Sequence, residues 1–93
     1  MKRELLRTNA FIRAAKKFVK RHPEAGPEIA SALQLLCEDP FVPGLKTHKL
    51  KGILDGSWAC TAGYDLRIVF KFVEHEGKDA ILLETIGTHD EVY

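Results

Sequence analysis

The chain has 93 residues, a net charge of +1 and a hydrophobic fraction of 45%, which suits one small folded domain over residues 1–93 and excludes a largely disordered chain. Its apolar runs are too short to cross a bilayer, and its N-terminus lacks the apolar core and cleavage site of a signal peptide. We therefore expect a cytoplasmic protein with no membrane attachment, in which Cys37 and Cys60 stay reduced.

Positive charge is concentrated at the N-terminal end of the chain. Residues 1–22 hold eight Lys or Arg and one Glu, a net of +7, whereas residues 23–93 hold six basic and twelve acidic residues, a net of −6. A basic segment of this kind suits contact with phosphates or with an acidic partner. The alternative is an ordinary solvated helix face, and charge alone does not decide between the two.

Two helices are predicted after a short leading strand at residues 5–6. Thr8 is a typical N-cap, and apolar residues recur at helical spacing over 11–21. Pro27 suits the first turn of a second helix, because a first-turn amide needs no partner within the helix. Asp39-Pro40 should end this helix, so the two helices form a hairpin.

Strands are predicted at 45–51, 58–62, 66–73 and 80–86, and a polar hairpin turn at 74–79 joins the last two. Residues 66–73 give the strongest strand signal, because apolar side chains alternate there. Short connections favour an antiparallel meander with both helices on one face. The predicted fold class is therefore α+β, with an N-terminal helical hairpin on a small antiparallel sheet whose other face is left for function.

Residues on these strands and at their ends suit the cleavage of a phosphodiester. His48 and His89 can transfer protons near neutral pH, and Arg67 can hold a phosphate through its permanent charge. Asp65 is placed to pair with Arg67 or to orient an imidazole, while Tyr93 lies four residues after His89. Each of these has a structural alternative: a lone His is more often structural, and Asp65 with Arg67 is equally a surface ion pair.

The chain also holds side chains of the kinds that bind metals. His48, Cys60, Asp65 and His89 are possible ligands, but no pair has the close spacing of a structural zinc site. We expect neither a metal nor any other cofactor. Trp58 is interpreted first as a core residue and second as a surface on which a base stacks.

Three motifs together resemble the RelE/ParE toxin superfamily, and most closely its YafQ-like mRNA interferases. They are Leu45-Lys46-Thr47-His48-Lys49-Leu50, Asp65-Leu66-Arg67-Ile68-Val69-Phe70 and Gly87-Thr88-His89-Asp90-Glu91-Val92-Tyr93. The resemblance covers almost the whole chain and is strongest over 45–93. No single motif is diagnostic, whereas the three in this order and spacing are fairly specific.

The resemblance implies a type II toxin that enters the ribosomal A site and cuts mRNA there without a metal, through attack by the 2′-OH on the adjacent phosphate. It implies a cognate antitoxin protein as partner, with the ribosome and mRNA. His48, Asp65, His89 and Tyr93 match positions of the YafQ-like pattern, and Arg67 matches an arginine of RelE and YoeB. The implied roles are proton transfer for the two histidines, phosphate binding for Arg67, orientation for Asp65 and stacking for Tyr93.

Further residues are expected to contact RNA or the ribosome, and all of them are basic or aromatic. They are Arg13, Lys16, Lys17, Lys20, Lys46, Lys49, Lys51, Trp58 and Lys71.

The chain also departs from its relatives. Thr61 stands where YafQ-like proteins often carry a His, and Trp58 and Cys60 stand where RelE places lysines. Two alternatives therefore stay open: a ParE-like toxin that binds DNA gyrase without nuclease chemistry, and a decayed toxin that only binds its antitoxin. His48 and His89 favour the nuclease, because a pure binding toxin does not need them.

Overall fold

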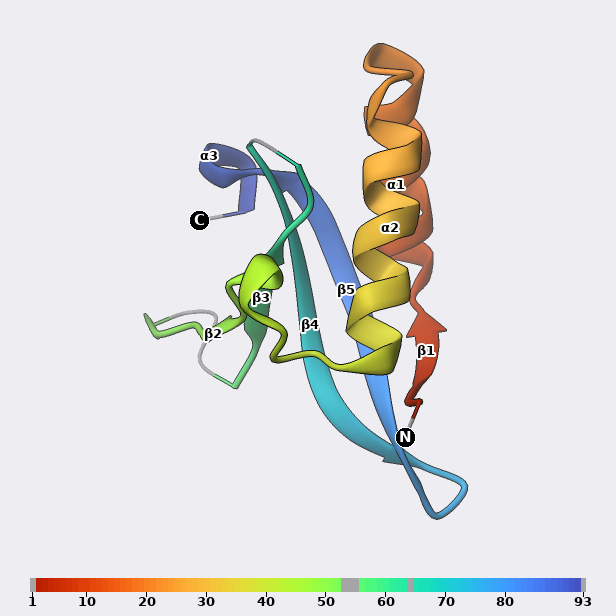
Figure 1. Ribbon diagram of the computed structural model, residues 1–93. Helices are drawn as coiled ribbons and strands as arrows, with labels where there is room; N and C mark the ends of the chain where they lie inside the picture. Colours follow the sequence, from red (N-terminus) through yellow and green to blue (C-terminus); the bar gives the residue numbers. More distant parts are fainter. Residues whose placement is uncertain (1, 53–55, 64, 93) are drawn as a thin grey trace.

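The described part of the protein consists of two long helices, a short third helix and a five-stranded sheet (Figure 1). The computed structural model describes residues 2–52, 56–63 and 65–92. The strands follow the order β1-β5-β4-β3-β2 across the sheet, and α1 and α2 run side by side as an antiparallel pair. In chain order the elements are β1 (Glu4–Arg7), α1 (Asn9–Arg21), α2 (Ala25–Glu38), the 3-10 turn η1 (Pro43–Leu45), β2 (His48–Lys49), β3 (Trp58–Thr61), β4 (Leu66–His75), β5 (Lys78–Thr88) and α3 (His89–Val92).

Thr8 is the N-cap of α1 and also forms a hydrogen bond to the sheet. Its hydroxyl accepts a hydrogen bond from the Phe11 amide at 3.0 Å, which satisfies a first-turn N–H, and it also lies 2.9 Å from the Leu83 carbonyl oxygen on β5. The predicted N-cap is therefore confirmed, and so is the end of α1 at Arg21. The second helix starts at Ala25, so that Pro27 lies in its first turn as expected.

The leading strand is confirmed, but its direction corrects the prediction of an antiparallel sheet. β1 pairs in parallel with β5, with Glu4 opposite Ala80, while every other strand pair is antiparallel. No hairpin joins β1 to β5, so no turn forces the two strands to run in opposite directions. The fold class is α+β as predicted, and the sheet is mixed.

The strand predicted over 45–51 is mostly wrong. Only His48–Lys49 is a strand, because Pro43–Leu45 forms a 3-10 turn and Lys46 has a left-handed backbone with φ of 50°. A left-handed residue cannot continue an extended chain. The strand predicted over 58–62 is confirmed as β3, which is one residue shorter.

The β4–β5 hairpin is longer than predicted and its turn is tighter. β4 runs to His75 and β5 starts at Lys78, which leaves two turn residues. Glu76 and Gly77 both have positive φ, 52° and 77°, as a type I′ turn requires. This turn matches the right-handed twist of the strands, so it supports a long hairpin.

The main core lies between the two helices and one sheet face, as predicted from the alternation in residues 66–73. Leu36 of α2 and Phe70 of β4 are both fully buried there. A second, smaller cluster lies on the opposite face, where Val92 packs against three buried side chains. These three side chains are Leu50, Ala59 and Val69.

Candidate active site on the open sheet face

The candidate site lies on the sheet face away from α1 and α2, here called the open face. Directly paired residues on neighbouring strands share a face. His48 pairs with Ala59, and Ala59 pairs with Val69, so His48 stands on the face of the smaller cluster. Thr61 and Arg67 are paired two residues further along the same two strands, and therefore share this face.

The strand register sets the distance between His48 and Arg67. His48 and Val69 are two strand spacings apart, about 10 Å, and Arg67 lies one pleat repeat beyond Val69. His48 and Arg67 are thus placed to meet one extended substrate from two sides, and not to contact each other.

His48 is exposed, and its ring is oriented by the backbone. Its Nδ1 lies 2.9 Å from the carbonyl oxygen of Lys46. Since a carbonyl only accepts, Nδ1 carries the proton in this contact, and the lone pair of the neutral ring belongs to Nε2. This tautomer suits a proton acceptor.

His89 begins α3, a single helical turn that follows β5 directly. Its backbone amide donates to the Asp65 carbonyl oxygen at 3.2 Å, and its Nδ1 lies 3.5 Å from Oδ1 of Asp90. Glu91 closes the turn by accepting a hydrogen bond from the Thr88 amide at 2.8 Å. The imidazole of His89 is therefore presented from a fixed turn at the end of β5.

Glu91 is a residue that the sequence reasoning missed. Thr88-x-x-Glu91 is the sequence of a capping box, in which the Glu bonds back to the amide of the N-cap residue. The hydrogen bond from the Thr88 amide is the main cause of a lowered pKa of Glu91. Desolvation opposes it, while the Thr88 side chain and the charges of Arg21 and Lys17 lower the pKa further. The pattern was readable from the sequence.

Gly87 allows α3 to fold back over the end of β5. A Cβ at this position would lie 3.1 Å from the Glu91 Cβ and 3.3 Å from the Val92 Cγ1, which is closer than ordinary packing allows. With no side chain at Gly87, Val92 of α3 reaches the smaller cluster on the open face (Figure 1). His89 therefore begins a turn whose Val92 packs on the face that His48 shares.

Asp65 is exposed and lies immediately before β4. Within the described ranges no ion pair joins it to Arg67, whose Nη1 donates to the Leu66 carbonyl oxygen at 3.1 Å. Asp65 instead borders a cleft that Phe18 and Thr88 also line. It precedes the first residue of β4, so the alternation of the strand does not set its direction. Its carbonyl oxygen accepts the hydrogen bond from the His89 amide.

Tyr93, predicted to stack or to position the substrate, lies outside the described residues. Cys60 of β3 is fully buried in the main core. This burial raises the pKa of its thiol to about 12, although the nearby charge of Arg67 acts in the opposite direction. A neutral buried thiol is neither a nucleophile nor a metal ligand. Among the described residues, no three His, Cys, Asp or Glu side chains gather as a set of metal ligands.

The basic side chains of α1 divide between two surfaces. Lys17 and Arg21 border a cleft shared with Glu91 of α3, near the candidate site. Lys16 and Lys20 flank the outer groove between α1 and α2, which is otherwise apolar. Arg13 is exposed on the same helix.

The other predicted RNA contacts lie on the sheet. Nζ of Lys71 is 3.7 Å from Oε2 of Glu84, so its charge is partly balanced by a neighbour. Trp58 is half-buried and packs against the main core, which agrees with its first interpretation. Lys46, Lys49 and Lys51 are exposed on and around β2. No helix of the described part is long and apolar enough to cross a membrane.

No protein-family model matches the sequence, and no curated protein matches it either. Several solved structures match the chain. YafQ from E. coli superposes with a TM-score of 0.79 over 98% of both chains at 20% identity. The chain has the fold of the YafQ toxins.

Related structures share this YafQ fold. A YoeB/ParE toxin from Agrobacterium tumefaciens has a TM-score of 0.73 at 18% identity, over 92% of this chain and 98% of that one. A structure of the E. coli DinJ-YafQ complex matches with a TM-score of 0.77 at 22% identity, over 98% of both chains. The resemblance inferred from the three sequence motifs is thus confirmed at the level of the fold.

Proposed function

We propose that this chain is the toxin of a type II toxin–antitoxin system, and that it is a ribosome-dependent endoribonuclease that cuts mRNA in the A site. The observation that supports this most is the open face of the YafQ-like fold. His48 of β2 and Arg67 of β4 share that face by register, and His89 begins the turn that follows β5, the strand next to β4. A structural role does not require such groups on the face that the helices leave uncovered.

The chemistry follows from these groups. One imidazole takes the proton from the 2′-OH, and the 2′-oxygen attacks the adjacent phosphorus. Arg67 balances the charge that builds on the phosphate oxygens. The bond to the 5′-oxygen breaks as the second imidazole, in its protonated form, gives that oxygen a proton. The products are a 2′,3′-cyclic phosphate and a 5′-OH.

The tautomer of His48 supports its assignment as the base, since Nδ1 is engaged with the Lys46 carbonyl and Nε2 carries the lone pair. His89 then serves as the acid. Its Nδ1 lies 3.5 Å from Oδ1 of Asp90, which helps to orient the ring.

The proposed partners are the ribosome, mRNA and a cognate antitoxin protein. The complex of YafQ with DinJ, which has the same fold in its toxin chain, supports the last of these. The fold is compatible with activity in the cytoplasm.

Induced expression in a bacterium, with primer extension on a reporter mRNA, tests the proposal. The wild type should give cuts in frame with translation, and His89→Ala should lower cleavage by about 10² to 10⁴-fold, the usual effect of removing a proton-transfer group. His75→Ala is the matched control, because His75 lies at the far end of β4 and contacts Glu4. It should cut like the wild type.

Other outcomes separate the alternatives. Arrested growth without cuts, accompanied by a DNA-damage response, would indicate a toxin that binds gyrase. Normal growth without cuts would indicate a decayed toxin. Cleavage that survives in His89→Ala would remove His89 from the mechanism.

A further inference from the structure

An aromatic cluster with positive charges above it lies on the other side of β2 from His48. Phe41 stacks on Phe72 with ring centroids 5.7 Å apart and an interplanar angle of 21°, and it meets Trp58 edge-on at 5.7 Å. Trp58 and Phe72 are also in edge contact at 5.2 Å. The cluster is continuous with the main core through Trp58 and Phe72.

Phe41 is the unusual member of this cluster. It is 55% exposed, and Leu35 is the one other large apolar side chain that is exposed among the described residues. Its loop is ordered locally, because the Phe41 amide donates to Oδ1 of Asp39 at 3.0 Å. A fixed aromatic ring with an open side is a stacking surface.

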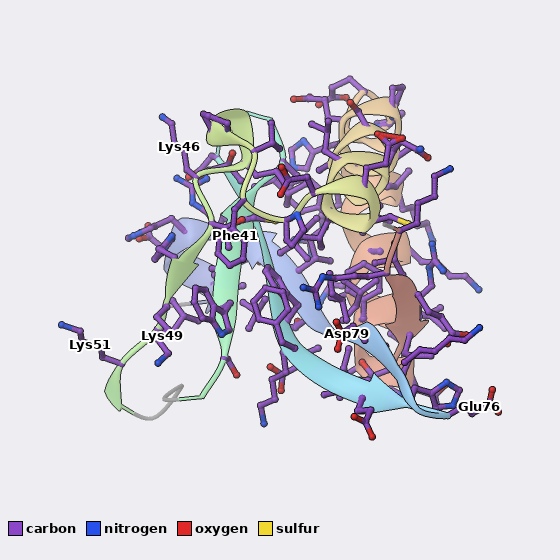
Figure 2. All side chains as sticks on the ribbon, turned by 60° about the horizontal axis from the view of Figure 1, so that its bottom comes forward. Phe41, Lys46, Lys49, Lys51, Glu76 and Asp79 are labelled. Carbon is purple, nitrogen blue, oxygen red and sulfur yellow. The ribbon has the colours of Figure 1, made fainter. Side chains whose placement is uncertain are left out.

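Two cations lie over rings of the cluster, while Asp39 lies beside Phe41 and Asp79 is 3.8 Å from Nη1 of Arg3. Nζ of Lys49 lies 5.8 Å from the centre of the Trp58 ring, and Cζ of Arg3 lies 5.2 Å from that of Phe72. Lys46 and Lys51 flank Lys49, and no Asp or Glu occurs from residue 41 to residue 52. Figure 2 shows the three lysines on one side of Phe41, with Asp79 and Glu76 on the other.

β2 connects this cluster to the candidate site. Successive residues of a strand point to opposite faces, so His48 lies on the open face and Lys49 on the face of Trp58. β2 is also the edge strand of the sheet. A flexible single-stranded polymer bound across this edge would contact the imidazole on one face of the sheet and the aromatic rings on the other.

We propose that Phe41 and Trp58 form a stacking platform for a base of single-stranded RNA, held by phosphate contacts to Lys46, Lys49 and Lys51. This inference rests on the proposed function and specifies how the RNA substrate of that site is bound. Edge lysines alone have a simpler explanation, since they keep sheet edges from pairing. They do not account for an exposed Phe stacked beside a Trp, which is the pattern of aromatic residues in a basic groove that binds single strands.

Trp58 makes a direct test possible, because it is the only tryptophan of the chain. The probe is a short single-stranded RNA with 2′-O-methyl groups, which cannot be cut by 2′-OH attack. Added to the full-length protein, it should quench the Trp58 fluorescence as it binds. Phe41→Ala should weaken binding at least about fivefold, the lower end of the effect of one stacked base. Phe41→Tyr, which keeps the ring, should bind like the wild type.

Leu35→Ala is the matched control, since it removes the other exposed apolar side chain from a different surface and should leave RNA binding unchanged. Circular dichroism verifies that each variant is folded. An RNA of the same length with abasic positions should bind Phe41→Ala and the wild type alike, because stacking needs the bases.

Two results would overturn the platform. One is equal RNA affinity for Phe41→Ala and the wild type. The other is a loss in Phe41→Ala of binding to an antitoxin protein with RNA binding intact, which would make the cluster a protein-docking surface. Because the probe cannot be cleaved, a chain without nuclease activity can still pass this test, and an active nuclease can still fail it.

Discussion

At the scale of single residues, Thr61 is the most informative departure from the YafQ-like pattern. It pairs with Arg67 across β3 and β4, on the open face, and its hydroxyl lies 3.4 Å from the Gly44 carbonyl oxygen. The position is half-buried, so a larger side chain can turn toward solvent. A histidine here would stand beside the residue proposed to hold the phosphate.

We predict that Thr61→His raises the rate of mRNA cleavage about 10-fold, a modest share of what a well-placed proton-transfer group contributes. The measurement is the initial rate of cleavage of a reporter mRNA in a translation extract. Thr61→Gln is the control, since it adds bulk and hydrogen bonding without a group that titrates near neutral pH. Equal rates for the His and Gln variants would contradict the prediction.

At the scale of elements, the α3 turn is held by one exposed carboxylate. Glu91 accepts from the Thr88 amide, and its pKa is lowered as a result. A carboxylate with a lowered folded-state pKa stabilises the fold at pH values above its unfolded-state pKa, and this stabilisation is lost as the pH falls through the folded-state pKa. The stabilisation from Glu91 is therefore lost at pH values below the ordinary pKa of a Glu.

We predict that Glu91→Gln lowers the free energy of unfolding by less than about 1 kcal/mol at pH 7, because the group is exposed and solvent screens its charge. The difference from the wild type should shrink as the pH falls below about 4. Urea unfolding at both pH values measures it. A difference that is the same at the two pH values would show that the carboxylate charge does not hold the turn.

At the scale of the whole molecule, the charge of the N-terminal third governs how the protein meets an anionic partner. Residues 1–22 carry a net of +7. The structure divides the basic residues of α1, with Lys17 and Arg21 turned toward Glu91 and Lys16 and Lys20 beside the outer groove. Of these pairs, only the second has no acidic residue of the chain lining its cleft.

We predict that ribosome binding weakens steeply with salt. If four basic residues of α1 neutralise phosphates, a fourfold rise in salt lowers the affinity roughly 100-fold. Replacing both Lys16 and Lys20 with Gln should flatten the salt dependence more than the same change at Lys17 and Arg21. The charges of Lys17 and Arg21 are partly balanced by the Glu91 carboxylate. Sedimentation with ribosomes at increasing KCl measures both slopes. A flat response in the wild type would show that α1 does not bind rRNA.

Much of the fold was predictable because its signals are local. Thr8 caps α1 with its own hydroxyl, and the alternation in residues 66–73 places Phe70 in the core and Arg67 on the open face. The shared face of His48 and Arg67 follows from strand register, and their role together with His89 stays a prediction. The capping box of Thr88 and Glu91 was equally local and was missed.

The sequence by itself determined the two long helices, the strands around 58–62, 66–73 and 80–86, and the apolar face of each, because these depend on neighbours within a few residues. Only the tertiary structure decided that β1 runs parallel to β5, that Lys46 breaks the predicted strand, and that Asp65 supports His89 through its backbone. It also decided that Phe41 stays exposed on Trp58. These features depend on contacts between residues far apart in the chain, whose free energies no local pattern encodes.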